Sequence, residues 1–387
     1  MNSIKKDLIK IIRLAVHEKS GLSSLKDVDW AEIWKRAQRN HLEGIVYDVA
    51  KTCSSSVPKA LLEVMQRKHY EMVARDAKQI RCLEQIEETL SRSGIPYAPQ
   101  KGSILRYDYP RTNLRFMSDL DICVRPEDRA LIRDAIETIG GVFRGTESGD
   151  EQFLIQGTIG VEFHGRLLYR KGSDGAIENY PCWELVDSAK NRLTEEGFAL
   201  NLIGHAVYDL SKGGPGVRYI LDLWVYCHRH TPQPDWNVVD EWLKKDGIYE
   251  AAHNLLDLSE YLFGTGAERE TLLADSSRHA LMTEMADYIL DGGLHGDTRR
   301  GVAAQVARSG GKSGAAAKQF FRNRKDYENR YPWLKKAPFL LPVAWGMRAC
   351  KSLKNHGGVI RKWRKDVRSL SKEEVRVQKD RMKRWGV

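Results

Sequence analysis

The chain has 387 residues, of which 42% are hydrophobic and 29% are charged. This length corresponds to two or three domains of about 150 residues each. The apolar fraction is high enough to build a hydrophobic core, which excludes a wholly disordered chain. The six cysteines stand singly, without a Cys-x-x-Cys pair, which argues against a zinc ribbon or a disulfide scaffold and favours a reducing cytoplasm.

The sequence does not resemble that of a membrane-spanning protein. The first 20 residues place apolar side chains on a stripe that charges interrupt at every third or fourth position, which predicts an amphipathic helix and not a signal peptide. The longest apolar run, residues 337–347, contains two prolines and is shorter than the roughly 20 residues that cross a bilayer. We therefore expect a cytoplasmic protein without a transmembrane segment.

The positive charge is concentrated at the C-terminus. The formal net charge is +10, and residues 351–387 contain 13 Lys and Arg against 4 Asp and Glu, which is +9 of that excess. Basic helical tails bind nucleic acid, anionic lipid surfaces or acidic partners. The simpler alternative is a solvated terminal helix, although Trp363 and Trp385 among the charges favour a binding role.

Changes in hydrophobic spacing predict an α+β protein in which a small mixed sheet is flanked by helical lobes. Apolar residues recur at helical spacing up to about residue 90, and short extended runs bounded by glycine and proline follow. We expect an N-terminal helical lobe, an α+β core, a second helical lobe, and a final segment of flexible loop, aromatic and proline-containing stretch and basic helix. Their bounds are 1–92, 93–185, 186–300 and 301–387.

The core is predicted to run strand, helix, strand, helix and hairpin. Pro126 followed by two acids is typical of a helix start, and Gly157-Thr158 has the composition of a hairpin turn. The predicted elements are residues 95–99, 103–109, 120–124, 126–139, 152–156 and 159–168. Beyond the core, helices are predicted at 197–210, 217–227, 236–263 and 281–289, and the Gly- and Ala-rich segment 292–318 predicts a mobile loop or linker.

The residues that suggest chemistry lie in the predicted core. Gly102-Ser103 follows the first strand and opens a helix, so backbone N–H groups, the Ser103 hydroxyl and the positive helix end converge, an arrangement that binds phosphate. Asp119 and Asp121 stand two apart on the next strand and share one face, while Leu120 points into the core. Two carboxylates on one strand face can hold Mg²⁺.

A third carboxylate follows on a later strand. Glu162 and His164 also share a face, opposite to Val161 and Phe163. An Asp-x-Asp pair alone is a weak signal, because it is common on solvated loops. The Gly-Ser pair upstream, the helix start at Pro126 and the later Glu162 together predict a functional site.

These motifs resemble the nucleotidyltransferases of the DNA polymerase beta superfamily, whose pattern is a Gly-Ser helix start, an Asp-x-Asp strand and a later carboxylate. More narrowly, residues 101–128 (KGSILRYDYPRTNLRFMSDLDICVRPED) resemble a bacterial family of uncharacterised nucleotidyltransferases. Blocks at 161–167, 205–226 and 331–348 extend the resemblance to about three quarters of the chain. Where the family typically has Val-Asp-x-His-Trp, this chain has Glu162 for the Asp and Gly165 for the Trp.

The resemblance implies an enzyme that transfers an NMP from an NTP to a hydroxyl or phosphate of an acceptor, with Mg²⁺ or Mn²⁺. Asp119, Asp121 and Glu162 would be the catalytic residues and metal ligands of a two-metal mechanism. His164 would orient Glu162 or contact the acceptor. The acceptor, a small molecule, a peptide or protein, or an RNA, would bind the helical lobe at 186–300.

The resemblance also implies a phosphate-binding set around the same strands. Gly102 and Ser103 would hold the β- and γ-phosphates, and Lys101 and Arg115 would neutralise the triphosphate or the pyrophosphate leaving group. The Ser118 hydroxyl would help these residues to bind the nucleotide. The full set of nucleotide-binding candidates is Lys101, Gly102, Ser103, Arg115 and Ser118.

Two other functions stay open at this point. The same metal site would serve a glycosyl or phosphoryl transferase that uses a different donor. A catalytically silent protein would instead use its basic tail to bind nucleic acid or an anionic surface. The first alternative differs from the nucleotidyltransferase hypothesis in the donor that stabilises the protein. The second predicts that binding to nucleic acid or an anionic surface weakens with salt and requires the tail.

Three further motifs receive structural explanations. Gly-Lys-Ser at 311–313 imitates the end of a P-loop, but the residue five positions before Gly311 is Val306 and no strand precedes it. Cys-His-Arg-His at 227–230 is predicted to be a pair of surface histidines and not a zinc site, because adjacent helical residues point in different directions. Arg218 and Asp222 stand four apart, which favours a helical ion pair over a place in the cleft.

Overall fold

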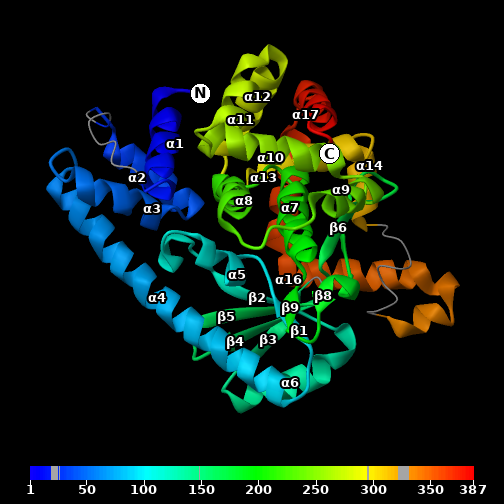
Figure 1. Ribbon diagram of the computed structural model, residues 1–387. Coiled ribbons are helices and arrows are strands. Elements are labelled where there is room, and N and C mark those ends of the chain that lie inside the picture. The colour runs from blue at the N-terminus through cyan, green and yellow to red at the C-terminus, as the bar shows by residue number, and fades with distance from the viewer. Residues whose placement is uncertain (19–24, 26, 148, 294–295, 321–330) are drawn as a thin grey trace.

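A five-stranded mixed sheet lies between helices that cover both of its faces (Figure 1). The structure is a computed structural model that describes residues 1–387 except 19–24, 26, 148, 294–295 and 321–330. The arrangement is α+β with a small mixed sheet and helices on either side in sequence, so the predicted fold class is confirmed.

The described part of the first 92 residues consists of helices joined by short turns, as the apolar spacing predicts. In the first helix, the Asn2 side chain caps the N-terminus by accepting from the Lys5 backbone N–H, and Ile11 and Ile12 are completely buried. The elements are α1 (Ser3–Val16), α2 (Trp30–Asn40), α3 (Glu43–Ala50), the 3₁₀ turn η2 (Lys51–Cys53) and α4 (Lys59–Arg92).

The order of strands in the central sheet is β1-β2-β5-β4-β3. β2 and β5 pair in parallel, whereas the other neighbours are antiparallel. This topology places the strand with two aspartates directly beside the strand with Glu162. The bounds are β1 (Tyr97–Pro99), β2 (Asp119–Val124), β3 (Val142–Glu147), β4 (Asp150–Ile155) and β5 (Ile159–His164).

The β4–β5 hairpin was predicted, with its turn at Gly157, and the structure confirms it. Strand β3 was missed. It lies at the edge of the sheet, its first two residues, Val142 and Phe143, are exposed, and a bulge between Phe143 and Gly145 interrupts its alternation. The predicted strand 159–168 ends at His164, and β6 (Leu168–Lys171) pairs instead with β7 (Ile177–Tyr180).

One face of the sheet is buried beneath two helices. Leu120, Ile122, Val161 and Phe163 pack on that face against α4 and α6 (Arg129–Thr138), which follows the turn η5 (Pro126–Asp128). In Figure 1, α4 runs past the sheet to meet α6 below it, and α5 (Gly102–Leu105) and α7 (Glu195–Ser211) lie on the opposite side. Because side chains alternate along a strand, the polar residues of β2 and β5 emerge on this second side.

Helices make up most of the chain after the sheet. The predicted helix 236–263 is two helices, because Gly247 adopts a left-handed φ of 68° between them. The helices are α7 (Glu195–Ser211), α8 (Val217–Arg229), α9 (Trp236–Lys245), α10 (Tyr249–Phe263), α11 (Ala267–Ala274) and α12 (Ser276–Asp291). The short elements before them are η3 (Arg106–Asp108), η4 (Thr112–Leu114), η6 (Trp183–Leu185), β8 (Val186–Asp187) and β9 (Arg192–Leu193).

The described residues of the segment 292–318 are largely helical, which corrects the predicted loop. The segment contains α13 (Thr298–Arg308) and the start of α14 (Lys312–Phe320), and Val302 and Val306 are buried against Val367. Alanine is the best helix former, and here tertiary packing outweighs the flexibility that the glycines suggested. The Lys312 ammonium donates to the Arg368 carbonyl, 2.9 Å away, so the Gly-Lys-Ser motif is part of helix packing.

The basic tail forms two helices, α16 (Leu341–Ser369) and α17 (Lys372–Arg384), after the turns η7 (Pro332–Lys335) and η8 (Pro338–Leu340). Trp385 is 1% exposed and packs edge-on against Tyr288 of α12. This tryptophan therefore anchors the tail in the core. None of the helices in the described ranges is both long and apolar enough to cross a bilayer.

Candidate active site

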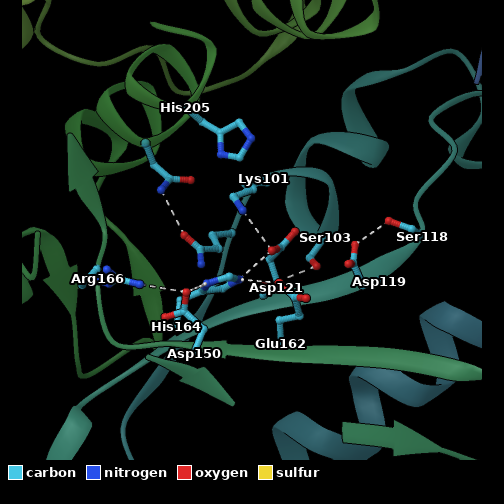
Figure 2. A network of polar contacts seen from close by, with 12 residues as sticks. Lys101, Ser103, Ser118, Asp119, Asp121, Asp150, Glu162, His164, Arg166 and His205 are labelled. Carbon is cyan, nitrogen blue, oxygen red and sulfur yellow. Dashed lines mark hydrogen bonds and ion pairs between the residues drawn. The ribbon is translucent and has the colours of Figure 1, made fainter. Parts of the chain in front are cut away.

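The three predicted carboxylates lie on one face of the β2–β5 pair (Figure 2). Asp121 and Glu162 are register partners, and ligand atoms of Asp121, Glu162 and His164 all lie within 4.8 Å of one another. Asp119 stands two residues earlier on the same face. Burial raises the pKa of Glu162, and the negative charge of Asp119 raises it further, so this face concentrates negative charge.

Lys101 supplies a positive charge to this face. Its Nζ lies 2.9 Å from Asp121 Oδ1, and both side chains are largely buried. Burial acts to lower the pKa of Lys101, but the charge of Asp121 outweighs it and the pKa is raised. Lys101 has a left-handed φ of 52°, an uncommon conformation that turns the chain sharply after β1 and before Gly102.

His164 connects Asp121 with a carboxylate that the sequence reasoning missed. Its Nε2 lies 2.7 Å from Asp121 Oδ1, and its Nδ1 lies 3.4 Å from Asp150 Oδ2. Burial and Lys101 act to lower the pKa of His164, but Asp121 and Asp150 raise it to about 9. Arg166 donates to Asp150 over 3.1 Å. The available signal was the predicted hairpin, in which Asp150 is close to the position opposite His164.

The Gly-Ser pair is packed tightly under the site. Ser103 is 1% exposed, and its Oγ donates to the Asp121 carbonyl at 3.5 Å. A Cβ on Gly102 would lie 2.4 Å from Met117 Sδ and 2.8 Å from Arg115 Nη1, so only glycine fits there. The turn formed by residues 101–103 thus lies directly against the strand that carries the aspartates.

Arg115 is held inside the protein by Asp222 of α8. Its Nε and Nη2 donate to the two Asp222 oxygens at 2.9 and 2.7 Å, and Tyr109 donates to the same carboxylate at 2.7 Å. The predicted pairing of Arg218 with Asp222 is therefore wrong. Arg218 instead donates to the Phe116 carbonyl at 2.8 Å. Asp222 therefore pairs with Arg115, a buried residue from a distant segment, and not with its neighbour on the helix.

The loop before β2 is fixed by α4. Arg75 and Gln79 donate to the carbonyl of Met117, at 3.2 and 3.1 Å, and Arg75 also donates to the Ser118 carbonyl. The exposed Ser118 hydroxyl donates to Asp119 Oδ1 at 2.7 Å. These contacts fix the position of Asp119 at the start of β2.

A histidine of α7 lies across from the carboxylates. Figure 2 shows His205 on the far side of Lys101 from Glu162. Its Nδ1 is 3.1 Å from the Tyr169 hydroxyl, and its Nε2 is 3.4 Å from Asp209. Sequence reasoning included this stretch only as a block that resembles the family, and gave His205 no role.

Comparison with known proteins decides the family. Residues 26–264 match the model of a family described as uncharacterised nucleotidyltransferases. The chain belongs to this family. The protein is thus a nucleotidyltransferase, and the resemblance seen in the sequence is confirmed, although the block at 331–348 lies beyond the matched residues.

Other comparisons give little further information on this nucleotidyltransferase. No curated protein matches the chain. A solution structure of the antibiotic-resistance factor ANT(2'')-Ia is similar over 54% of this chain and 97% of that chain, with 15% sequence identity and a TM-score of 0.25.

Proposed function

We propose that this nucleotidyltransferase moves an NMP from an NTP to a hydroxyl or phosphate group of an acceptor, with Mg²⁺ or Mn²⁺ held by Asp119, Asp121 and Glu162. The observation that carries the proposal is the parallel register of β2 and β5, which sets Asp121 beside Glu162 on the face of the sheet opposite α4 and α6. Carboxylate oxygens are the ligands that Mg²⁺ prefers.

The side chains present fit a divalent cation. The carboxylates of Asp121 and Glu162 converge at half-buried positions, and the pKa of Glu162 is raised by burial first and then by the negative charges of Asp119 and Asp121. A bound cation would offset this charge, polarise the α-phosphate and lower the pKa of the attacking hydroxyl. Lys101 and His164 provide the compensating positive charge in the protein alone.

The residues of the chain would bind and orient the reactants. Lys101 has the charge and position to exchange its contact with Asp121 for the triphosphate, which would lie along the turn formed by residues 101–103. His164 holds the Asp121 carboxylate in place between the strands. Arg115, with all three nitrogens donating to Asp222 and Phe116, would act by fixing the loop before β2.

We propose that the acceptor approaches from the side of α7, in the lobe at 186–300. His205 faces the carboxylates from that side across Lys101 (Figure 2). An acceptor hydroxyl placed there would attack the α-phosphorus as the bond to pyrophosphate breaks. The helices that surround His205 would then determine which acceptor binds.

The experiment that tests the proposal measures which phosphate of the NTP is transferred to the product. The purified protein, Mg²⁺ and a cell extract are incubated with NTPs labelled at the α- or the γ-phosphate. Label from the α-phosphate is expected in product, and Asp119→Ala and Asp121→Ala should lose it, whereas Asp134→Ala, which removes an exposed acid of α6, should keep it. Transfer of the γ-label would indicate a phosphoryl transferase, and equal labelling by all variants would reject the proposal.

A further inference from the structure

A second group of metal-binding side chains lies outside the β2–β5 face, where α8, α10 and α11 meet. His228 of α8, Glu260 of α10 and Glu268 of α11 each offer one ligand atom, and these atoms lie within 4.8 Å of one another. We propose that this is a binding site for a divalent transition-metal ion of the Zn²⁺ type, separate from the proposed catalytic cation.

The hydrogen bonding of His228 fixes which nitrogen faces the acids. Its Nδ1 lies 2.9 Å from the Trp224 carbonyl, and a carbonyl can only accept, so Nδ1 carries the proton and donates it. The ring also stacks on Trp224 with centroids 4.6 Å apart. Nε2 therefore points at Glu260. Donation from the other ring nitrogen to a backbone carbonyl is the usual arrangement of a metal-bound histidine.

Glu260 brings a buried oxygen without a hydrogen bond. The residue is 8% exposed, and its Oε2 has no hydrogen-bond partner although it lies 3.2 Å from His228 Nε2. Leaving such an oxygen unsatisfied is costly. Two ligands on a tetrahedral ion with bonds of about 2.0–2.1 Å are separated by about 3.3 Å. The spacing of Nε2 and Oε2 therefore suits a shared metal.

The backbone makes room for this carboxylate. A Cβ on Gly264 would lie 1.7 Å from Glu260 Oε1, so the side chain can fold over α10 only because residue 264 is glycine.

Two nearby arginines, Arg13 and Arg269, donate hydrogen bonds to the end of α10. Arg13 donates to the carbonyls of Leu262 and Tyr261, at 2.5 and 3.0 Å, and Arg269 donates to the Tyr261 carbonyl at 3.2 Å. Both guanidinium groups therefore cap the last turn of α10. Glu268 is exposed, which leaves a path for an ion to enter and room for a water ligand.

The chemistry of the donors selects the ion. One imidazole nitrogen and two carboxylates match Zn²⁺ and its neighbours in the transition series, whereas Mg²⁺ prefers oxygen ligands alone. The sequence predicts no zinc site within 227–230, because adjacent helical residues point in different directions. The two acids come instead from α10 and α11, and His230 turns away to Asp108 and Glu195.

The test must separate this site from the carboxylates of β2 and β5. The full chain carrying Asp121→Asn, which removes a central acid of the catalytic face, is stripped with EDTA and titrated with Co²⁺ as a spectroscopic probe, with Zn²⁺ as competitor. One equivalent should bind with the intense visible absorption of a four- or five-coordinate ion. Adding His228→Gln should weaken binding at least about tenfold.

Glu268→Gln provides a second arm, because its exposed side chain can be changed without disturbing the fold. It should also weaken Co²⁺ binding, whereas Glu270→Gln, an exposed acid of the same helix, should not. Equal melting temperatures in EDTA show that the variants are folded. The proposal is overturned if the Asp121→Asn protein binds no Co²⁺, or if His228→Gln and Glu268→Gln titrate like their parent, because His228 and Glu260 would then be only an ion pair.

Discussion

Asp121 and Glu162 stand side by side on the parallel strands β2 and β5, although α6 and two further strands separate them in sequence. Both side chains leave the sheet on the face opposite α4 and α6. Lys101 and His164 reach the same carboxylate of Asp121 from two directions, at 2.9 and 2.7 Å. One aspartate thus links the turn after β1, strand β2 and strand β5.

The length of the acid at position 162 should matter less than its charge. Glu162→Gln removes the charge and is expected to lower nucleotidyl transfer by about a hundredfold or more, a loss typical of a group that stabilises transition-state charge. Glu162→Asp should keep measurable activity, because the family typically carries Asp there. Labelling from the α-phosphate measures both. Full activity in the Gln variant would remove Glu162 from the site.

The Arg115–Asp222 pair should be a major source of stability. Arg115→Met leaves the buried Asp222 carboxylate without its counter-ion and should lower the free energy of unfolding by about 3–5 kcal/mol. The double variant with Asp222→Leu should recover part of that loss. Urea denaturation measures the change, with Arg376→Met, which breaks an exposed pair with Glu373, as a control costing less than about 1 kcal/mol. A loss this small for Arg115→Met would contradict the account.

Gly102 should tolerate no side chain. Gly102→Ala would place a methyl group 2.4 Å from Met117 Sδ, and is expected to destabilise the protein by about 1–3 kcal/mol through overpacking. Gly346→Ala is the matched control, because a Cβ at Gly346 meets open space within α16 and should stabilise the protein by about 0.5–1 kcal/mol. Thermal denaturation compares them. Equal effects of the two substitutions would show that the packing at Gly102 is not tight.

The His230 cluster should make stability depend on pH. Burial acts to lower the pKa of His230, but hydrogen bonds with Asp108 and Glu195 raise it above the ordinary value of 6.5. The imidazolium therefore stabilises the fold fully below pH of about 6.5, and this contribution is lost as the pH rises through the folded-state pKa. A double-mutant cycle of His230→Gln and Asp108→Asn should show coupling that falls between pH 6 and pH 9. Constant coupling would mean that the histidine is neutral throughout.

Local spacing was enough to place the aspartates. The alternation of Asp119, Leu120 and Asp121 predicted which side chains share a face, and the burial of Leu120 in the structure agrees with it. The pairing of β2 with β5 is a contact between distant segments that no local pattern encodes. For the same reason, Asp222 was assigned to Arg218, its helical neighbour, when its partner is Arg115 from a distant loop.

The errors in the predicted fold came from segments whose residue composition is compatible with more than one kind of secondary structure. The glycines and alanines of 292–318 suggested a loop, but Val302 and Val306 at helical spacing supply the apolar face that packs α13. The edge strand β3 escaped detection because exposed Val142 and Phe143 break the alternation expected of a half-buried strand. In both cases the neighbouring element, which is not visible in the local sequence, decided the outcome.

The most direct test of the central claim is a crystal structure with a non-hydrolysable NTP and Mg²⁺. We predict at least one cation ligated by Asp119 and Asp121, the triphosphate along the turn formed by residues 101–103, and Lys101 Nζ moved from Asp121 to a phosphate oxygen. A nucleotide bound away from the β2–β5 face, with Lys101 still paired to Asp121 and no cation at the carboxylates, would contradict the account.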